Sequence, residues 1–195
     1  AVTEKFVLVG CDDGKNGSGG NSKILSLRKS NGKLVSSLKT KGDLRSSVTY
    51  DKAQKAYWIS SKAGFVYRFK SDEKSGKLSA LKAYKACGSV TSTPVVCNNR
   101  VYFGAQDGEK GRFVVLDARA MKKLYDCSLD GYPQSTALIS TGYENRVYIY
   151  MTINQKPGGI MMFEDFADRT KPEMTELFSP SGALSQYCIS SVTAG

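Results

Sequence analysis

Residues 100–118 read RVYFGAQDGEKGRFVVLDA, in which two short apolar runs flank a polar turn that contains glycine. Residues 101–103 form the first run and residues 113–116 the second. β-Branched and aromatic residues on both sides of such a turn predict two antiparallel strands joined as a hairpin. The same pattern recurs in the rest of the chain.

A basic residue followed by an apolar triplet occurs four times. The copies begin at Lys5, Lys55, Arg100 and Arg146, at steps of 50, 45 and 46 residues. A fixed period of this length indicates a repeat architecture. A second apolar run follows each copy, at residues 24–27, 66–69, 113–116 and 160–163.

Each copy has a weaker third run, and after three of these runs a glycine and a Ser/Thr-rich crossing lead into one more strand. The third runs are residues 34–39, 78–84, 123–129 and 174–178, and the runs after the crossings are residues 48–50, 95–97 and 138–140. Four short antiparallel strands per repeat, without helical periodicity, are typical of a β-propeller blade. The sequence thus predicts an all-β, single domain over residues 1–195, with blades at about 1–42 plus 189–195, 48–88, 95–131 and 138–182.

Two details of this fold can be predicted further. Gly64, Gly111 and Gly158 precede the second runs at steps of 47 residues, and we expect each to supply a hairpin position with positive φ. The chain opens on a second strand and ends on residues 189–192, so we expect this last segment to complete the first blade as its inner strand. Three alternatives follow: a four-bladed monomer, a dimer that exchanges this strand, or a piece of a propeller with seven or eight blades.

The third copy resembles a known family. The segment RFVVLDA at residues 112–118 and the segment STPVV at residues 92–96 are similar to the quinoprotein-like propellers with PQQ-type repeats. The resemblance implies a secreted or cell-surface bacterial protein. It also implies, as one alternative, a PQQ-dependent dehydrogenase with calcium held by carboxylate and amide oxygens, an Asp base and a tryptophan platform.

Composition argues against several classes of enzyme. The 195 residues include no histidine, the commonest general base near neutral pH and a common metal ligand. The five cysteines are odd in number and form no C-x-x-C pair, so we expect free thiols that are buried or half-buried rather than a bond between Cys11 and Cys188. The sequence shows neither a long apolar span nor a charged-then-apolar leader, and we expect no membrane insertion.

The net charge of +10 is concentrated in one half of the chain. Residues 1–100 carry 19 Lys/Arg against 7 Asp/Glu, whereas residues 101–195 carry 9 against 11. This distribution favours either a solvated face or a surface for polyanions, to be tested by charge reversal at Lys39, Lys41 and Arg45. Lysine dominates, so we expect no specific nucleic-acid binding.

Ligands of propellers bind at the mouth of the channel, where the crossings between blades converge. We expect a polar ring there, whose hydroxyls either cap backbone or contact a ligand. The candidate ligand-binding residues are Arg45, Ser46, Thr91, Ser92, Gln134, Ser135, Ser185 and Gln186. The oxygen-rich loops at residues 12–21 and 106–111 lack the spacing of a calcium loop and are predicted to be hairpins.

These observations favour a non-catalytic binding or scaffold module, with no catalytic residue, metal or cofactor, and with a protein or polysaccharide partner outside the cell or on its surface. One alternative is a fragment of a dehydrogenase that uses PQQ with calcium. The other is a polyanion or glycan binder that uses the basic N-terminal half.

Overall fold

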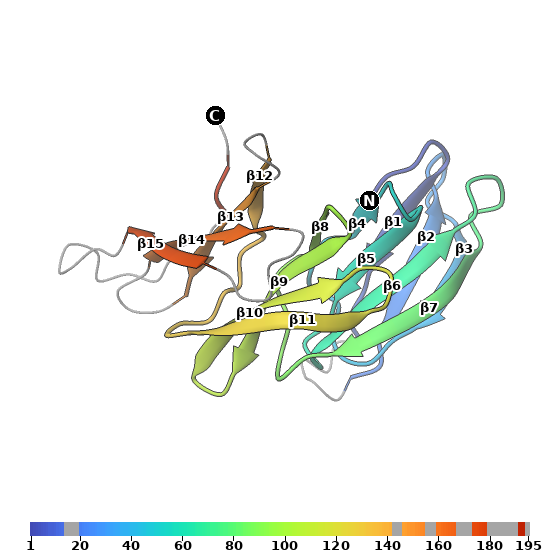
Figure 1. Ribbon diagram of the computed structural model, residues 1–195. Coiled ribbons are helices and arrows are strands. Elements are labelled where there is room, and N and C mark those ends of the chain that lie inside the picture. Colours follow the sequence, from blue (N-terminus) through green and yellow to red (C-terminus); the bar gives the residue numbers. More distant parts are fainter. Residues whose placement is uncertain (14–19, 142–145, 155–158, 167–172, 179–190, 194–195) are drawn as a thin grey trace. The chain divides into compact units, whose positions relative to one another are not determined.

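The computed structural model describes residues 1–13, 20–141, 146–154, 159–166, 173–178 and 191–193. These residues form four antiparallel sheets (Figure 1). The first holds β1 (Phe6–Gly10), β2 (Lys23–Arg28) and β3 (Leu34–Lys39), and the second holds β4 (Thr49–Asp51), β5 (Ala56–Ser60), β6 (Phe65–Ser71) and β7 (Leu78–Lys85). The third holds β8 (Val95–Cys97), β9 (Arg100–Asp107), β10 (Lys110–Asp117) and β11 (Lys122–Leu129), and the fourth holds β12 (Leu138–Thr141), β13 (Val147–Ile153), β14 (Gly159–Asp165) and β15 (Glu173–Phe178).

Each sheet follows the order of the chain, so every sheet is an antiparallel meander. The prediction of repeated antiparallel sheets is confirmed, with three strands in the first sheet and four in each of the others, and every predicted second, third and fourth run coincides with a strand. In each of the four sheets, the last two strands in chain order shift register once where they pair: β2 with β3, β6 with β7, β10 with β11, and β14 with β15. Such an irregularity bends and twists a strand, which helps to protect an outer edge from further pairing.

The inner position of the first sheet is occupied by the start of the chain itself. Ala1 and Leu8 exchange two backbone hydrogen bonds of 2.8 and 2.9 Å, and Val2 pairs with Val7. Our expectation that residues 189–192 complete this blade stays a prediction. Three residues suffice because the inner strands β4 and β8 are themselves only three residues long. Residues 189 and 190 lie outside the described part, and residues 191–193 form no strand.

The structural reason for glycine at the 47-residue step differs from the positive φ that we expected. Gly64 has a φ of 78°, as predicted, but Gly111 does not have positive φ, and the turn before it uses Gly108 at 62°. A side chain at Gly64 would collide with the carbonyl oxygen of Gly88, and one at Gly111 with that of Gly131. Close approach of the hairpin to the end of the outer strand therefore explains the repeated glycine. Gly158 lies outside the described residues.

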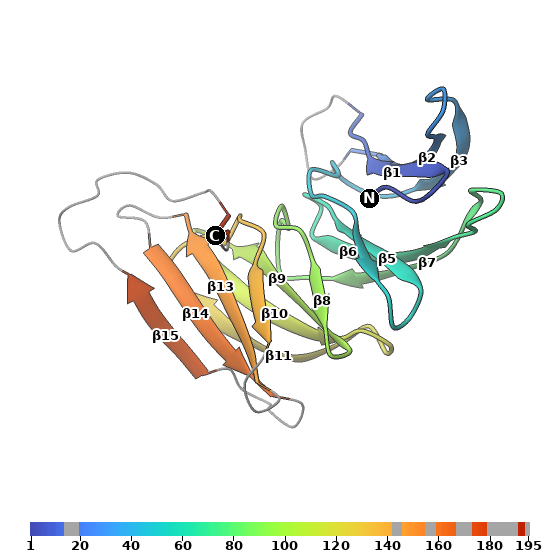
Figure 2. The ribbon, with the colours of Figure 1, turned by 90° about the horizontal axis from the view of Figure 1, so that it is seen from above.

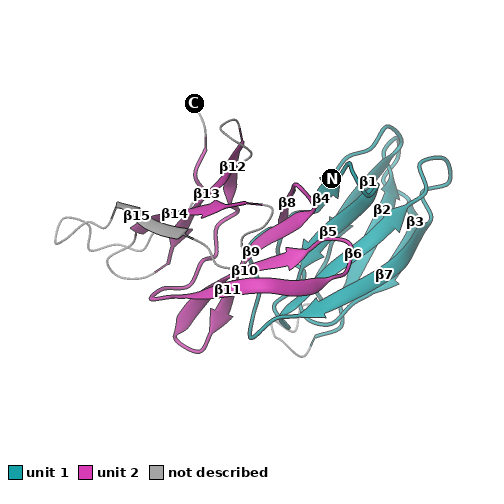
Figure 3. Cartoon of the chain, viewed as in Figure 1, with its two compact units in different colours: residues 1–93 teal, residues 94–195 magenta. Residues whose placement is uncertain are grey.

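The chain divides into two compact units, residues 1–93 and 94–195, and each contains two sheets (Figure 3). We call them unit 1 and unit 2. Among the described residues, no helix has the length and apolar character that a membrane crossing requires. The single domain predicted for the whole chain stays a prediction.

Unit 1 is held together by apolar side chains between its two sheets. Leu8 and Ile24 of the first sheet share a buried cluster with Tyr57, Ile59 and Phe69 of the second. Figure 2 shows these two sheets next to each other within the unit. Burial of these apolar side chains supplies the main stabilising contribution to unit 1.

Unit 2 repeats this arrangement between the third and fourth sheets. The ring of Phe113 on β10 stacks on that of Phe163 on β14, with centroids 4.0 Å apart, and both side chains are fully buried. Ile149 and Met151 of β13 belong to the same cluster. In both units, therefore, the core lies between successive sheets rather than within one.

A buried polar cluster also joins the two sheets of unit 2. Asp165, at the end of β14, is 1% exposed and accepts three hydrogen bonds: from Arg100 Nη1 at 2.7 Å, from Tyr102 Oη at 2.7 Å and from Tyr125 Oη at 2.5 Å. A buried carboxylate is tolerated only when it is paired and hydrogen-bonded. The carboxylate of the fourth sheet therefore depends on three side chains of the third.

The burial of the described cysteines agrees in part with the prediction from the sequence. Cys11, Cys97 and Cys127 are half-buried free thiols, as expected, whereas Cys87 is exposed. Burial raises the pKa of the Cys127 thiol to about 11 and also raises that of Cys97. Cys188 lies outside the described residues.

The substitution Asp165→Asn should destabilise unit 2. The amide offers one acceptor in place of two carboxylate oxygens and leaves the buried Arg100 without its counter-charge, so we expect a loss of about 3 kcal/mol of unfolding free energy. Urea unfolding followed by circular dichroism measures it. Glu164→Gln is the control, since Glu164 is the adjacent residue and pairs with Arg146 at 3.4 Å. Equal effects of the two substitutions would show that the buried cluster is not important.

The tyrosines of this cluster should make the fold sensitive to alkali. Burial, together with the neighbouring Asp165 carboxylate, raises the pKa of Tyr102 and Tyr125 far above the ordinary 10.0. The folded state then holds these protons more tightly than the unfolded state, so their contribution is complete below about pH 10 and is lost above it. We expect the urea midpoint to fall steeply above that pH. A Tyr102→Phe/Tyr125→Phe variant should show a shallower fall, and an identical profile would contradict this origin.

Candidate binding surface

The crossing from the first to the second sheet is fixed by a serine. Ser46 Oγ accepts a hydrogen bond from the Ser60 amide at 2.8 Å. Ser60 is the last residue of β5, and β4, the inner neighbour of β5, begins only at Thr49 opposite Trp58. The inner strand is therefore too short to reach this buried amide, and the serine hydroxyl replaces the missing strand partner.

The same arrangement occurs in unit 2. Ser135 Oγ accepts from the Thr152 amide on β13 at 3.1 Å, and both residues are buried. Ser46 and Ser135 each lie three residues before the first residue of an inner strand, at Thr49 and Leu138. Our sequence-based reading that these hydroxyls cap backbone is confirmed at both positions.

The other residues predicted to bind a ligand lie in different environments. The Ser92 side chain is fully buried and its carbonyl accepts from Ser60 Oγ at 2.7 Å, whereas Thr91 beside it is half-buried. Gln134 Oε1 accepts from Asn154 Nδ2 at 2.9 Å. Ser185 and Gln186 lie outside the described residues. Since the others are divided between the two units, a ring formed by all eight stays a prediction.

Arg45 is the predicted residue whose surroundings suit a ligand best. Its guanidinium lies 3.6 Å from the carboxylate of Asp43, and its side chain is 45% exposed. Asp43 is fully buried and its carboxylate oxygens accept no hydrogen bond in the described structure, so the ion pair to Arg45 compensates its charge. The buried carboxylate thus holds a cation at the surface.

Four lysines lie at the same end of unit 1 as Arg45. Tyr67 Oη accepts from the Lys41 amide at 2.9 Å, and the Lys62 amide donates to the Asp43 carbonyl at 2.9 Å, so the crossing is tied to the hairpin between β5 and β6. Lys23 and Lys39 lie directly opposite each other on β2 and β3. We call Lys23, Lys39, Lys41, Arg45 and Lys62 the cationic end.

The opposition of Lys23 and Lys39 is unfavourable by itself, because like charges directly across a strand pair repel. Unit 1 as a whole carries 18 Lys/Arg against 7 Asp/Glu, a net charge of +11. Unit 2 carries 10 against 11. The positive field therefore belongs to unit 1, and a bound anion would relieve the repulsion.

The described residues do not fit a quinone cofactor with calcium. Trp58, the single tryptophan, is fully buried in the second sheet, so it offers no platform. Asp43 is the one carboxylate in residues 43–47, 89–93 and 132–136, and it is paired with Arg45. No group of three or more His, Cys, Asp or Glu side chains that could hold a metal ion occurs within the described ranges.

Comparison with known proteins identifies the fold. No family model matches the chain, and no curated protein matches it. A quinohemoprotein alcohol dehydrogenase from Pseudomonas putida HK5 matches 80% of this chain with a TM-score of 0.52 and 14% identity. A europium-containing methanol dehydrogenase matches 88% with a TM-score of 0.60 and 13% identity.

The chain spans about a third of these two enzymes, 32% and 39% of their respective lengths. The predicted resemblance to the quinoprotein β-propellers is confirmed, and the four sheets match part of such a propeller. At this level of identity the likeness concerns the fold alone, and it does not transfer an activity.

The crossing serines give a direct test of the local structure. Ser46→Ala and Ser135→Ala each leave a buried amide without its acceptor, and we expect each to lower the free energy of unfolding by about 1–2 kcal/mol. Ser37→Ala is the control, because Ser37 is exposed on β3. Urea unfolding measures all three. If the two crossing substitutions are as neutral as the control, the serines do not stabilise the crossings.

Proposed function

We propose that the chain is a non-catalytic binding module whose cationic end contacts an acidic polysaccharide. The observation that carries the proposal is the geometry of Arg45, a surface cation held by the fully buried carboxylate of Asp43 at the end of unit 1 that also carries the opposed pair Lys23 and Lys39. A cation restrained in this way loses less side-chain entropy when an anion binds.

Two further features support this choice of ligand. Unit 1 contains 15 lysines and 3 arginines, and lysine is a compact point charge that suits carboxylates and sulfates without demanding the bidentate geometry of nucleic-acid recognition. A secreted or cell-surface location, which we infer from the resemblance in sequence, would also bring the module into contact with such polymers. A protein partner with an acidic surface would use the same end.

Charge reversal within unit 1 tests the proposal. The variant Lys39→Glu/Lys41→Glu/Lys62→Glu should elute from immobilised heparin at much lower salt than the wild type, with affinity reduced about tenfold or more. The control Lys29→Glu/Lys33→Glu/Lys77→Glu changes the charge by the same amount but alters the turns at the opposite end of the strands. It should retain most of the binding.

Two outcomes would contradict the proposal. Equal loss in both variants would mean that the net charge alone, rather than the cationic end, causes retention on heparin. Equal or tighter binding to duplex DNA at the same salt would assign the surface to nucleic acid.

A quinone-dependent enzyme is the second candidate, since both matched structures are dehydrogenases by their descriptions. Reconstitution with PQQ and calcium tests it by visible absorbance. Our proposal predicts no stoichiometric binding, because Trp58 is buried and Asp43 is paired. A saturable spectrum at one cofactor per chain would overturn the non-catalytic assignment.

A further inference from the structure

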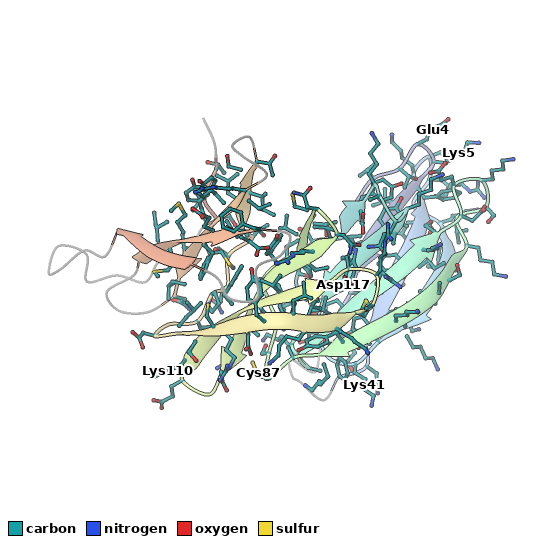
Figure 4. All side chains as sticks on the ribbon, viewed as in Figure 1. Glu4, Lys5, Lys41, Cys87, Lys110 and Asp117 are labelled. Atoms are coloured by element: carbon teal, nitrogen blue, oxygen red, sulfur yellow. The ribbon has the colours of Figure 1, made fainter. Side chains whose placement is uncertain are left out.

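A groove lies at the end of unit 1 that carries the turns before β1 and β5 and the turn between β6 and β7. Two adjoining cavities, of about 300 and 510 Å³, share Tyr50, Tyr57 and Glu73. Volumes of this size are typical of small-molecule sites. In Figure 4, Glu4, which lines the smaller cavity, is at the opposite end of unit 1 from Lys41 of the cationic end.

An aromatic ladder forms the floor of this groove. Tyr50 lies directly opposite Tyr57, with ring centroids 4.8 Å apart, and Tyr57 stacks on Phe69 at 5.6 Å. Phe69 is fully buried, Tyr57 is 6% exposed and Tyr50 is 45% exposed. The buried rings hold the outermost one in place, so Tyr50 presents a pre-organised aromatic surface to solvent.

Hydrogen-bonding groups surround this ring. Within the described residues, Glu4, Glu73 and the Tyr57 hydroxyl make no hydrogen bond or ion pair. Burial, with smaller effects of Tyr50 and Glu73, raises the pKa of Tyr57, so its hydroxyl remains a donor at neutral pH. The groove therefore offers carboxylate acceptors and a phenol donor beside an aromatic surface.

The charged side chains that line the groove balance one another, and the N-terminal ammonium of Ala1, which also lines the smaller cavity, donates to the Leu8 carbonyl at 2.9 Å. Glu4, Asp72 and Glu73 contribute three carboxylates, and Lys55, Lys70 and Lys74 contribute three ammonium groups. A free anion would meet the carboxylates and a free cation the lysines, so neither is favoured. A ligand without net charge, rich in hydroxyls and with one apolar face, complements all of these groups.

We propose that this groove binds a neutral oligosaccharide. One sugar ring stacks its C–H face on Tyr50 while its hydroxyls bond to Glu4 and Glu73, and the chain continues into the second cavity towards Lys55 and Lys70. The site is separate from the cationic end and does not depend on the acidic ligand proposed for it. A polysaccharide partner would then be held at two places on unit 1.

Titration with hexasaccharides of β-1,4-linked glucose, α-1,4-linked glucose and β-1,4-linked mannose tests the proposal, using saturation-transfer NMR on the full chain. We expect at least one of them to bind with a Kd of about 1 mM or tighter. Tyr50→Ala should weaken that binding about tenfold, whereas Tyr50→Phe retains the aromatic face and should bind nearly as well. Leu34→Ala is the control, since Leu34 is a 60% exposed apolar residue of the same unit.

Thermal unfolding of each variant verifies that it is folded. High salt should leave the binding unchanged, because the ligand has no charge. The proposal is wrong if none of the three sugars binds at about 5 mM, or if Tyr50→Ala binds as well as Leu34→Ala. Binding that disappears in high salt would also contradict the proposal, because a neutral sugar in this groove makes no ion pair that salt could screen.

Discussion

The structure depends on one hydrogen-bonding constraint: inner strands of three or four residues lie next to second strands of up to eight. Such short strands leave a buried amide of the longer strand without a partner. Ser46 and Ser135, in the crossings that precede the inner strands, supply the missing acceptor for Ser60 and Thr152. The crossing is thereby fixed to the sheet it enters, and successive sheets can bury apolar faces against each other.

The fixed crossing also determines what the surface can present. Because residues 43–47 are tied to the second sheet, the buried carboxylate of Asp43 can hold Arg45 at the surface, at the end of unit 1 where β2 begins at Lys23 and β3 ends at Lys39. At the other end of the same strands, the register of β4 and β5 aligns Tyr50 with Tyr57 and leaves one ring exposed. One pair of sheets therefore offers a strongly charged end and an aromatic, charge-balanced groove.

Much of the fold could be predicted because it depends on local pattern. Apolar runs and turns indicated the strands, and the spacing of Ser46, Ser92 and Ser135 indicated the crossings. Features that depend on pairing distant segments could not be predicted. The three residues before Glu4 carry no strand pattern, the role of Gly111 arises from contact with Gly131, and Asp165 meets Tyr102 and Tyr125 only in the folded unit. The Tyr50 groove was missed for the same reason, although a tyrosine in each of the two strand runs that flank the turn at residues 52–55 was a usable signal.

The most direct test of the account is native-state hydrogen exchange at the amides of Ser60 and Thr152, measured by NMR on the wild-type chain. Neither amide faces an inner strand, so without the serine hydroxyls both should exchange as rapidly as amides in an open turn. Because the serine hydroxyls accept from them, we expect both amides to be protected as well as neighbouring amides in β5 and β13. Rapid exchange at both amides would contradict it, because the crossings would then not be fixed to the sheets.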